Sequence, residues 1–358
     1  MRFCFVMLPF EYYSPVSGGA IATVTMNVIR ELEKNGHEAF VLAHDDAQPI
    51  YPTGGVRLLP VKPNSLMGGV ISHLQARLCG WDWQNQGRFW KSVHRELRSL
   101  SPDVVVLSND LVGAINVRAA LPGVKIAVWV HNECHSSGDI PSGLAATDVF
   151  LGCSHYIENW LLGRYSLPRD KVHVAYAGVD TDIFFPAKTE RLQHLRLLYT
   201  GRLDPNKGVD VAVEVFRRLK KGNFPVSLTV AGHSWFYNRE TRREEAFLKN
   251  LRKVMTESAV DWLGHVPRRW LPGVMRGHDI ALVLSRSREP FGLVVLEAMA
   301  SGLAVMASPY GGLRESCGEA GIFVDPGNPV EITKKLESLY EPTGELALWK
   351  GRSLERVM

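Results

Sequence analysis

Short apolar runs alternate with amphipathic helical patterns along this sequence, in two successive series. Runs rich in β-branched residues and apolar throughout are typical of strands buried on both faces of a parallel sheet. Two such series predict an α/β fold with two Rossmann-like domains facing each other across a cleft. The runs are residues 2–8, 38–43, 56–61, 103–108, 125–130 and 148–153, then 195–200, 226–231, 259–263, 279–284, 304–307 and 321–324.

The break between the two series lies near residues 180–190. The segment 175–180 and the stretch around Pro186 have the character of a crossover rather than of another strand. A chain of 358 residues is long enough for two cores, since single cores rarely grow past roughly 250–300 residues. We therefore expect domains at 1–183 and 184–358. Ligands of open α/β sheets bind outside the carboxyl ends of the strands, so both domains should present loops to the cleft.

Composition excludes several classes of protein. The five cysteines are scattered, odd in number and without a Cys-x-x-Cys pair, which argues against a disulfide framework or zinc ribbon and favours a reducing compartment. A net charge of +4 is too small to indicate nucleic-acid binding, although it permits attraction to anionic lipid. The first apolar run is only as long as a strand, so we expect neither a signal peptide nor a membrane span. We therefore expect the protein to be cytoplasmic.

The most informative local pattern lies between residues 285 and 315. Glu289 precedes a Phe291-Gly292 turn, and Glu297 falls inside the helix that should follow. A glycine turn that leads into a helix offers free backbone N–H groups and the positive end of the helix dipole, which can hold phosphate without a metal. The two carboxylates flank this anion site and could hold hydroxyls on either side of a diphosphate.

A second pattern follows the strand predicted at 195–200. Gly201, Arg202 and Lys207 place a glycine turn, a guanidinium and an ammonium on one strand-to-helix loop. Arginine offers a planar fork to phosphate oxygens and lysine a point charge, so together they could neutralise a leaving diphosphate. On their own, residues in this pattern are more often ordinary surface cations around a turn.

Together the two patterns resemble the Gly-Arg-Leu…Lys-Gly and Glu-x7-Glu segments of family 4 of the GT-B glycosyltransferases, a retaining group that uses nucleotide-sugar donors. The resemblance implies a hexosyltransferase with a UDP- or GDP-linked donor and a glycan or lipid-linked acceptor. It also implies that Glu297 takes the ribose hydroxyls and Glu289 those of the transferred sugar. The further donor-binding positions that it implies are Gly201, Gly232, Val266 and the amides of Phe291, Gly292 and Leu293.

Two places in the first series add to this site. Gly18 and Gly19 follow the first strand, where glycines let the backbone approach a ligand. His131 ends the strand at 125–130, and family enzymes carry a histidine at the corresponding strand end beside the donor hexose. Reading His131, Cys134 and His135 as metal ligands is disfavoured, because a fourth ligand is missing.

We expect metal-independent chemistry with no cofactor. Asp180-Thr181-Asp182 matches the Asp-x-Asp metal signature of the GT-A fold, but it stands where family 4 enzymes have a Gly-Val-Asp stretch at the domain junction, and Asx-rich turns are common there. No nucleophile with a partnered base is detectable, so a covalent intermediate has no candidate. The family's retention is usually explained by front-face substitution, in which positioning and charge stabilisation supply the catalysis.

The acceptor side stays open between two interpretations. Residues 65–100 mix aromatic and basic side chains, which suits contact with the inner face of a membrane. An ordinary amphipathic helix that packs its aromatics into the first core explains them equally well. The residues concerned are Trp81, Trp83, Phe89 and Trp90 among Arg77, Arg88, Lys91, Arg95 and Arg98.

Two features depart from the family pattern, and three alternative functions come into question. Ala304 stands where the family often has proline, and the chain ends at Met358, where the family's closing helix would begin. A non-catalytic nucleotide-sugar-binding subunit and a GT-B nucleotide-sugar epimerase remain as alternatives. The epimerase leaves the Glu-Pro-Phe-Gly segment unexplained. A phosphorylase is disfavoured, because no pyridoxal-binding lysine context is found.

Overall fold

The computed structural model describes residues 1–8, 11–16, 19–44, 49–59, 87–133, 139–187, 194–234 and 242–358. The chain divides into two compact units, Met1–Ala177 and Gly178–Met358. Each unit is an α/β domain built on one parallel sheet, and each is described here by itself.

The first unit contains a parallel sheet of seven strands in the order β3-β2-β1-β4-β5-β6-β7. The order turns back at β1, which lies between β2 and β4 because the chain winds outward first on one side and then on the other. Such a reversal is the point where open α/β sheets bind ligands. The strands are β1 Arg2–Val6, β2 Glu38–His44, β3 Gly55–Leu59, β4 Val104–Ser108, β5 Lys125–Val130, β6 Val149–Gly152 and β7 Val172–Val174.

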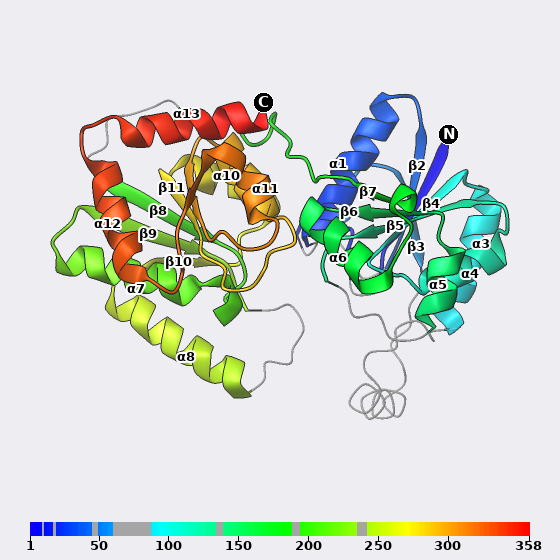
Figure 1. Cartoon of the computed structure of the whole chain (residues 1–358), viewed down its shortest axis with the longest axis horizontal. Helices are drawn as coiled ribbons and strands as arrows, with labels where there is room; N and C mark the ends of the chain where they lie inside the picture. The colour runs from blue at the N-terminus through cyan, green and yellow to red at the C-terminus, as the bar shows by residue number, and fades with distance from the viewer. Residues whose placement is uncertain are drawn as a thin grey trace. The chain divides into compact units, whose positions relative to one another are not determined.

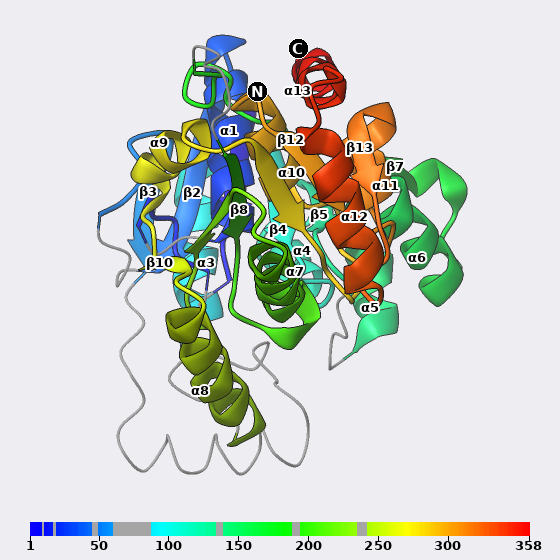
Figure 2. The same cartoon turned by 90° about the vertical axis from the view of Figure 1, so that its left-hand side faces the viewer.

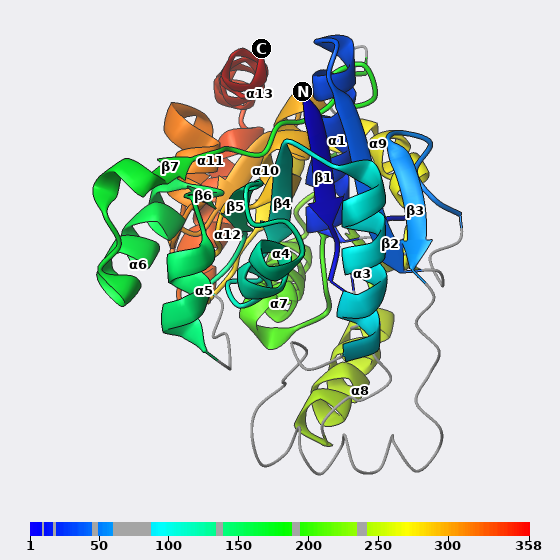
Figure 3. The same ribbon diagram turned by 90° about the vertical axis from the view of Figure 1, so that its right-hand side faces the viewer.

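Helices cover both faces of this sheet. Figure 1 shows α1 and α6 on one face and α3, α4 and α5 on the other, and Figure 3 shows the second group nearest the viewer. The helix α3 turns its aromatic side chains inward, since Phe89 and Trp90 are both only 4% exposed. For these two residues the core-packing interpretation is therefore correct, whereas Trp81 and Trp83 lie outside the described residues. The helices are α1 Ala20–Lys34, α3 Gly87–Leu100, α4 Gly113–Ala120, α5 Ile140–Ala146 and α6 His155–Tyr165.

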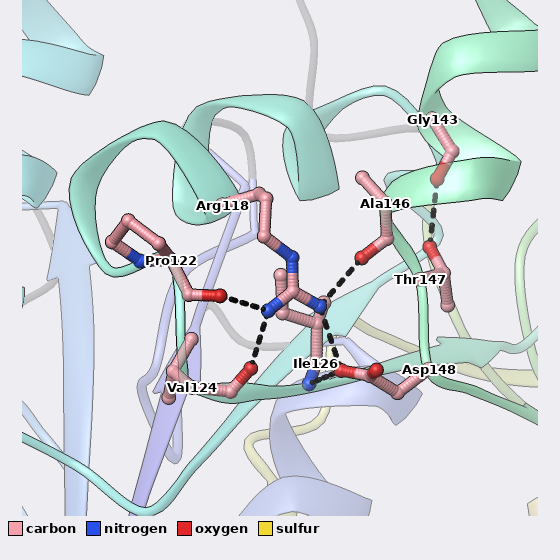
Figure 4. A network of polar contacts seen from close by, with 8 residues as sticks. All are labelled: Arg118, Pro122, Val124, Ile126, Gly143, Ala146, Thr147 and Asp148. Atoms are coloured by element: carbon pink, nitrogen blue, oxygen red, sulfur yellow. Dashed lines mark hydrogen bonds and ion pairs between the residues drawn. The ribbon is translucent and has the colours of Figure 1, made fainter.

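A polar network ties α4 to the amino-terminal edge of the sheet (Figure 4). Arg118 donates to the carbonyl oxygens of Pro122, Val124 and Ala146 at 2.7–2.9 Å and to Asp148 Oδ2 at 2.7 Å. Burial raises the pKa of Asp148, but hydrogen bonds from the Ile126 amide and from Arg118 outweigh it and hold the pKa below its ordinary value. Arg118 thus satisfies carbonyls at the end of the sheet opposite to the ligand-binding edge.

The second unit contains a parallel sheet of six strands in the order β10-β9-β8-β11-β12-β13. Here the order reverses at β8, which pairs with both β9 and β11. The strands are β8 Leu195–Thr200, β9 Val226–Ala231, β10 Asp261–Gly264, β11 Ile280–Val283, β12 Ala304–Ala307 and β13 Gly321–Phe323.

Helices cover both faces of this sheet, as Figures 1 and 2 show, and two apolar clusters pack against it. One is formed largely by α7, α8 and α12 and includes Val215, Leu251 and Leu336. The other is formed largely by α9, α10 and α11 and includes Met275 and Met299. The helices are α7 Val209–Lys221, α8 Arg242–Glu257, α9 Leu271–Arg276, α10 Leu293–Ala300, α11 Leu313–Cys317, α12 Pro329–Tyr340 and α13 Glu345–Val357.

The sequence predicted twelve of the thirteen strands, four of them with the observed bounds. The strand that it missed is β7, whose three residues Val172–Val174 are too few to give a periodic signal. The segment 175–180 after it is irregular, as predicted. None of the helices in the described ranges combines the length and the apolar character that crossing a membrane requires.

Candidate active site in the second unit

The predicted donor-binding residues lie at one edge of the second sheet. All strands of this sheet are parallel, so their carboxyl ends share that edge. Gly201 follows β8, Gly232 follows β9, Val266 follows the end of β10, and Glu289 follows β11. The strand-to-helix loops therefore bring together residues up to 96 positions apart in the sequence, Gly201 and Glu297 being the outermost.

Two glycines let the first two loops touch. A Cβ atom on Gly232 would lie only 1.8 Å from the carbonyl oxygen of Gly201, a contact that no side chain could accept. Gly232 is also held by its neighbours, because its carbonyl accepts the indole N–H of Trp262 at 2.9 Å and its amide donates to Gly264 at 2.8 Å. The glycine steps predicted after β8 and β9 thus have a steric reason.

The loop that carries Lys207 is a capped turn. The carboxylate of Asp204 accepts the amide of Asn206 at 2.8 Å, which starts a short 3-10 helix over Pro205–Lys207. Gly208 ends the turn at φ 71°, and a Cβ atom there would lie 1.9 Å from the carbonyl oxygen of Leu284. Only glycine fits both this backbone conformation and this approach to the end of β11. The turn therefore fixes Lys207 next to the loop that carries Glu289.

Lys207 and Glu289 form the central ion pair of the site. The ammonium Nζ lies 2.6 Å from Oε1 and 2.8 Å from Oε2 of the carboxylate. The hydroxyl of Ser285 donates to the same Oε1 at 2.6 Å. Both charged side chains are largely buried, with 26% of Lys207 and 10% of Glu289 exposed. The sequence suggested separate partners for these residues, one for the diphosphate and one for the sugar, whereas the structure pairs them with each other.

Arg202 lies on the same loop and is half-buried. Its backbone carbonyl accepts the hydroxyl of the buried Tyr199 at 2.7 Å, and its guanidinium lies 3.8 Å from the carboxylate of Asp204. Burial lowers the pKa of Arg202, and the negative charges of Asp204 and Glu289 oppose that shift. Because an arginine remains charged despite such a shift, Arg202 and Lys207 bring two positive charges to this edge.

A second ion pair, which the sequence did not suggest, connects the same two loops. Arg286 donates through both terminal nitrogens to the two carboxylate oxygens of Asp210 at 2.7 Å and also to the Pro205 carbonyl at 2.7 Å. The amide of Arg286 donates to the Asn206 carbonyl at 2.8 Å. These bonds join the loop after β8 to the loop after β11, so the position of Lys207 relative to Glu289 is held from both sides.

The backbone of Glu289 is held by the Gly311-Gly312 pair. Glu289 and Gly311 form an isolated parallel bridge, and the amide of Gly312 donates to the Glu289 carbonyl at 2.7 Å. Gly311 has φ 63°, and a Cβ atom there would lie 2.3 Å from the same carbonyl oxygen. The second glycine pair of the predicted motif is thus part of the support for Glu289.

The turn before α10 has the predicted form. Gly292 adopts φ 91° and caps the helix, Phe291 is 6% exposed, and Leu293 is the first helical residue. Glu297 lies on α10 and is 3% exposed. These residues place the amino-terminal end of α10 beside the loop that carries Glu289, where the helix dipole favours negative charge.

Glu297 has a partner that sequence reasoning missed. A guanidinium nitrogen of Arg268 lies 2.6 Å from Oε1 of Glu297, and the same guanidinium lies over the ring of Phe184 at 5.3 Å. Burial raises the pKa of Glu297, while the charge of Arg268 opposes the shift. An arginine seven residues after the start of β10 gives no signal by itself, so only the fold could identify it.

The predicted residues of the first unit are described only in part. Gly18, Cys134 and His135 lie outside the described residues. Gly19 caps α1, and its carbonyl accepts the Thr23 amide at 3.2 Å. His131 follows β5, and burial lowers its pKa to about 3, so its imidazole is neutral at physiological pH. Its Nε2 is buried and has no hydrogen-bond partner within the described part of the chain.

The Asp180-Thr181-Asp182 segment forms a turn. The carboxylate of Asp180 accepts the amide of Asp182 at 3.1 Å, which is the Asx turn expected for such a sequence. In the described ranges, no three histidine, cysteine, aspartate or glutamate side chains gather closely enough to hold a metal ion.

Comparison with known proteins adds two family matches. Residues 18–183 match the model of Glycosyltransferase Family 4, and residues 180–349 match that of Glycosyl transferases group 1. The two matches together span both units.

Individual relatives are distant in sequence. The chain is 26% identical to D-inositol 3-phosphate glycosyltransferase of Xylanimonas cellulosilytica, over 95% of this chain and 87% of that protein. It is 30% identical to mannosylfructose-phosphate synthase of Agrobacterium fabrum over 54% of this chain, but the match spans only 46% of that enzyme's length.

Solved structures share the fold. Sucrose-phosphate synthase from Thermosynechococcus elongatus matches with a TM-score of 0.76 at 15% identity, over 100% of this chain and 94% of that one. HepE of Anabaena, solved in complex with UDP and glucose, matches with a TM-score of 0.70 at 17% identity over the same shares of the two chains.

Proposed function

The chain belongs to family 4 of the GT-B glycosyltransferases, and on that premise we propose that it is a retaining enzyme that uses a nucleotide sugar without a metal ion. The donor would be UDP- or GDP-linked, and the acceptor a hydroxyl of a glycan or a lipid-linked glycan. That HepE was solved with UDP supports a nucleotide donor, since that protein has the same fold.

The observation that carries the proposal is the arrangement around Lys207. One sheet edge holds the cations Arg202 and Lys207, the start of α10 and the buried Glu289 and Glu297. A nucleotide sugar has a negatively charged diphosphate between two groups rich in hydroxyls, the ribose and the sugar. Cations and a helix start suit the diphosphate, and carboxylates suit the hydroxyls. Lys207 is held by Glu289, so its ammonium is oriented before any ligand arrives. Preorganised charge of this kind stabilises a leaving group more than mobile surface charge does.

Each side chain has a separate part in the proposed reaction. Arg202 and Lys207 bind the diphosphate oxygens, with the amides of Gly292 and Leu293 beside them. Glu289 binds hydroxyls of the transferred sugar, and Glu297 binds those of the ribose through the oxygen that Arg268 does not occupy.

Bond making and bond breaking take place on one face of the sugar. The acceptor oxygen forms a bond to the anomeric carbon while the bond from that carbon to the phosphate oxygen breaks. The acceptor proton passes to the departing phosphate, and the electron pair leaves with the nucleoside diphosphate. The cations of the site stabilise the charge that develops there.

His131 has a supporting part in this proposal. Its imidazole is neutral, so it can exchange a hydrogen bond with a sugar hydroxyl but brings no positive charge. By the family resemblance, Gly18 and Gly19 are proposed as donor-binding residues. We place the protein in the cytoplasm, with contact to the inner membrane face where the acceptor is lipid-linked.

A panel of UDP- and GDP-linked hexoses tests the function. Binding is measured by calorimetry, release of nucleoside diphosphate by a coupled assay, and the anomeric configuration of the product by NMR. The proposal expects binding of one donor, slow release without acceptor and a product with the configuration of the donor. Binding without any release, even with glycan acceptors present, would indicate a non-catalytic binding subunit, and an inverted product would refute retention.

A further inference from the structure

The proposed reaction assigns no part to Arg268, a largely buried cation of the second unit. Arg268 begins the short 3-10 helix Arg268–Trp270, which follows β10 at the carboxyl edge of the second sheet. One of its guanidinium nitrogens lies 2.6 Å from Oε1 of Glu297, and only 22% of the Arg268 side chain and 4% of the Glu297 side chain are exposed. This contact joins the loop after β10 to α10.

The Glu297 carboxylate needs a positive charge beside it. An ionised carboxylate that is taken out of water becomes neutral unless a cation compensates for the lost hydration. Burial raises the pKa of Glu297, and among the described residues Arg268 is the charged group that opposes the rise. Oε1 is buried and accepts no well-aligned hydrogen bond from any residue in the described ranges, so the compensation comes from charge. A carboxylate has about four acceptor positions, so Glu297 can still accept hydrogen bonds from a ligand.

The guanidinium of Arg268 also contacts an aromatic ring. Its central carbon lies 5.3 Å from the centre of the Phe184 ring, within the range of a cation–π contact. Phe184 is 1% exposed and belongs to the same apolar cluster as Val295 and Met299 of α10. The ring and the carboxylate are therefore anchored in one core, and together they restrict the orientation of the guanidinium.

The turn at Asp180–Asp182 places this ring. The amides of Ile183 and Phe184 donate to the Asp180 carbonyl at 3.2 and 2.9 Å, and the Asp180 side chain accepts the Asp182 amide in the same turn. The Asp-x-Asp segment thus has a structural part in the second unit, since it presents Phe184 to Arg268.

We propose that Arg268 is a positioning residue of the donor site, which holds the Glu297 carboxylate in place for the ribose hydroxyls of a nucleoside diphosphate. The inference rests on the proposed function, which assigns the ribose to Glu297. The charge of Arg268 keeps the buried carboxylate ionised, and the fixed guanidinium keeps it oriented. Arginine suits both tasks, because its planar group stays charged and stacks on an aromatic face.

Direct binding of the diphosphate is the other role that this cation could have. It fits the contacts less well, because a carboxylate and a ring already engage the guanidinium of Arg268. The two roles differ in one respect that can be measured: a positioning residue has no effect on the nucleotide once Glu297 is gone.

A double-variant cycle on the full chain tests the inference, with UDP and GDP as the probes in calorimetry. Arg268→Met should weaken binding of the diphosphate by roughly tenfold or more, the scale for losing a hydrogen bond to a charged group. In a chain that carries Glu297→Gln, the same change should weaken binding by less than about twofold, because the group through which Arg268 acts is absent. Arg268→Lys keeps the charge and should restore part of the affinity.

Arg269→Met is the matched control. Arg269 is the next residue along the chain, but it is exposed and its guanidinium lies over the ring of Trp270 at 5.4 Å. Its replacement changes the net charge of the unit by the same amount and should leave the affinity for the diphosphate unchanged.

The pH dependence of binding separates positioning from a purely structural part. Without Arg268 no described charge opposes the effect of burial, so the pKa of Glu297 rises further and the carboxylate becomes neutral at a higher pH. The affinity that Arg268→Met loses relative to the wild type should therefore be larger at about pH 6.5 than at about pH 8.5. A loss of the same size at both pH values would overturn the inference.

The remaining outcomes separate this inference from the proposed function. A chain that binds neither UDP nor GDP, or a Glu297→Gln variant that binds them as the wild type does, would overturn both. Unchanged affinity in Arg268→Met, an equal loss with and without Glu297→Gln, or an equal loss in Arg269→Met would overturn the inference alone. Should Arg268→Met not fold, the double variant leaves no buried charge behind and carries the test. It should bind as Glu297→Gln does, and a further tenfold loss would overturn the inference.

Discussion

Replacing Lys207 alone should destabilise the second unit more than replacing both Lys207 and its partner Glu289. At 2.6 Å and an effective dielectric constant of about 20, the gross attraction between Nζ and Oε1 is roughly 6 kcal/mol. Desolvation of the two groups cancels most of it. Exposed pairs contribute about 0–1 kcal/mol, and breaking a buried pair costs about 3–5 kcal/mol. With 26% and 10% of the two side chains exposed, Lys207→Met should cost about 2 kcal/mol.

The double variant distinguishes an ion pair from simple packing. Lys207→Met leaves the Glu289 carboxylate buried with only the Ser285 hydroxyl, whereas Lys207→Met combined with Glu289→Gln leaves no charge behind. We expect the double variant to be about 1 kcal/mol more stable than the sum of the two single changes predicts, since residues in direct contact are coupled.

Urea unfolding gives the free energies, and hydrogen exchange of the β8 and β11 amides assigns the change to the second unit. Asp210→Asn is the matched control, because the Asp210–Arg286 pair joins the same loops but is 36% and 42% exposed. It should cost less than about 1 kcal/mol. The ion-pair account is wrong if the costs of the two single variants add up to that of the double variant within about 0.5 kcal/mol. It is also wrong if Asp210→Asn costs as much as Lys207→Met.

Three further outcomes are expected. Arg202→Ala should lower turnover by roughly 10²-fold, the scale for losing one preorganised charge, and unchanged turnover would place the diphosphate elsewhere. Activity should survive EDTA; a loss restored by Mg²⁺ or Mn²⁺ would revive Asp180 and Asp182 as ligands. Because the pKa of Glu11 in the folded chain is about 7, against 4.5 ordinarily, the folded state binds its proton more tightly. Relative to Glu11→Gln, unfolding curves of the wild type should therefore show stability falling between pH 4.5 and pH 7, by up to about 3 kcal/mol, and a flat difference would contradict this.

The sequence predicted the parallel sheets because hydrophobic periodicity is a local property. The strands at 195–200 and 226–231 were placed at their observed bounds, since a run buried on both faces is apolar from end to end. A three-residue edge strand such as β7 carries no such signal. The sequence also indicated the glycine turns that follow the strands, and the structure shows the steric reason for them at Gly208 and Gly232.

Pairing between distant loops could not be read from the sequence. Lys207 and Glu289 are 82 residues apart, and nothing in either local pattern indicates that they meet. Arg268 and Glu297 meet for the same reason, because parallel strands bring their carboxyl ends to one edge.

The different parts of the two glutamates test the account most directly. Calorimetry with the free nucleoside diphosphate should show that Glu297→Gln weakens binding by roughly 1.5–3 kcal/mol, because the charge-assisted hydrogen bonds to the ribose are lost. Glu289→Gln should leave that affinity nearly unchanged and lower kcat/KM for the intact donor, since its contact exists only when the sugar is present. If Glu289→Gln weakens the free diphosphate as much as Glu297→Gln does, the two assignments are wrong and the donor lies in a different orientation.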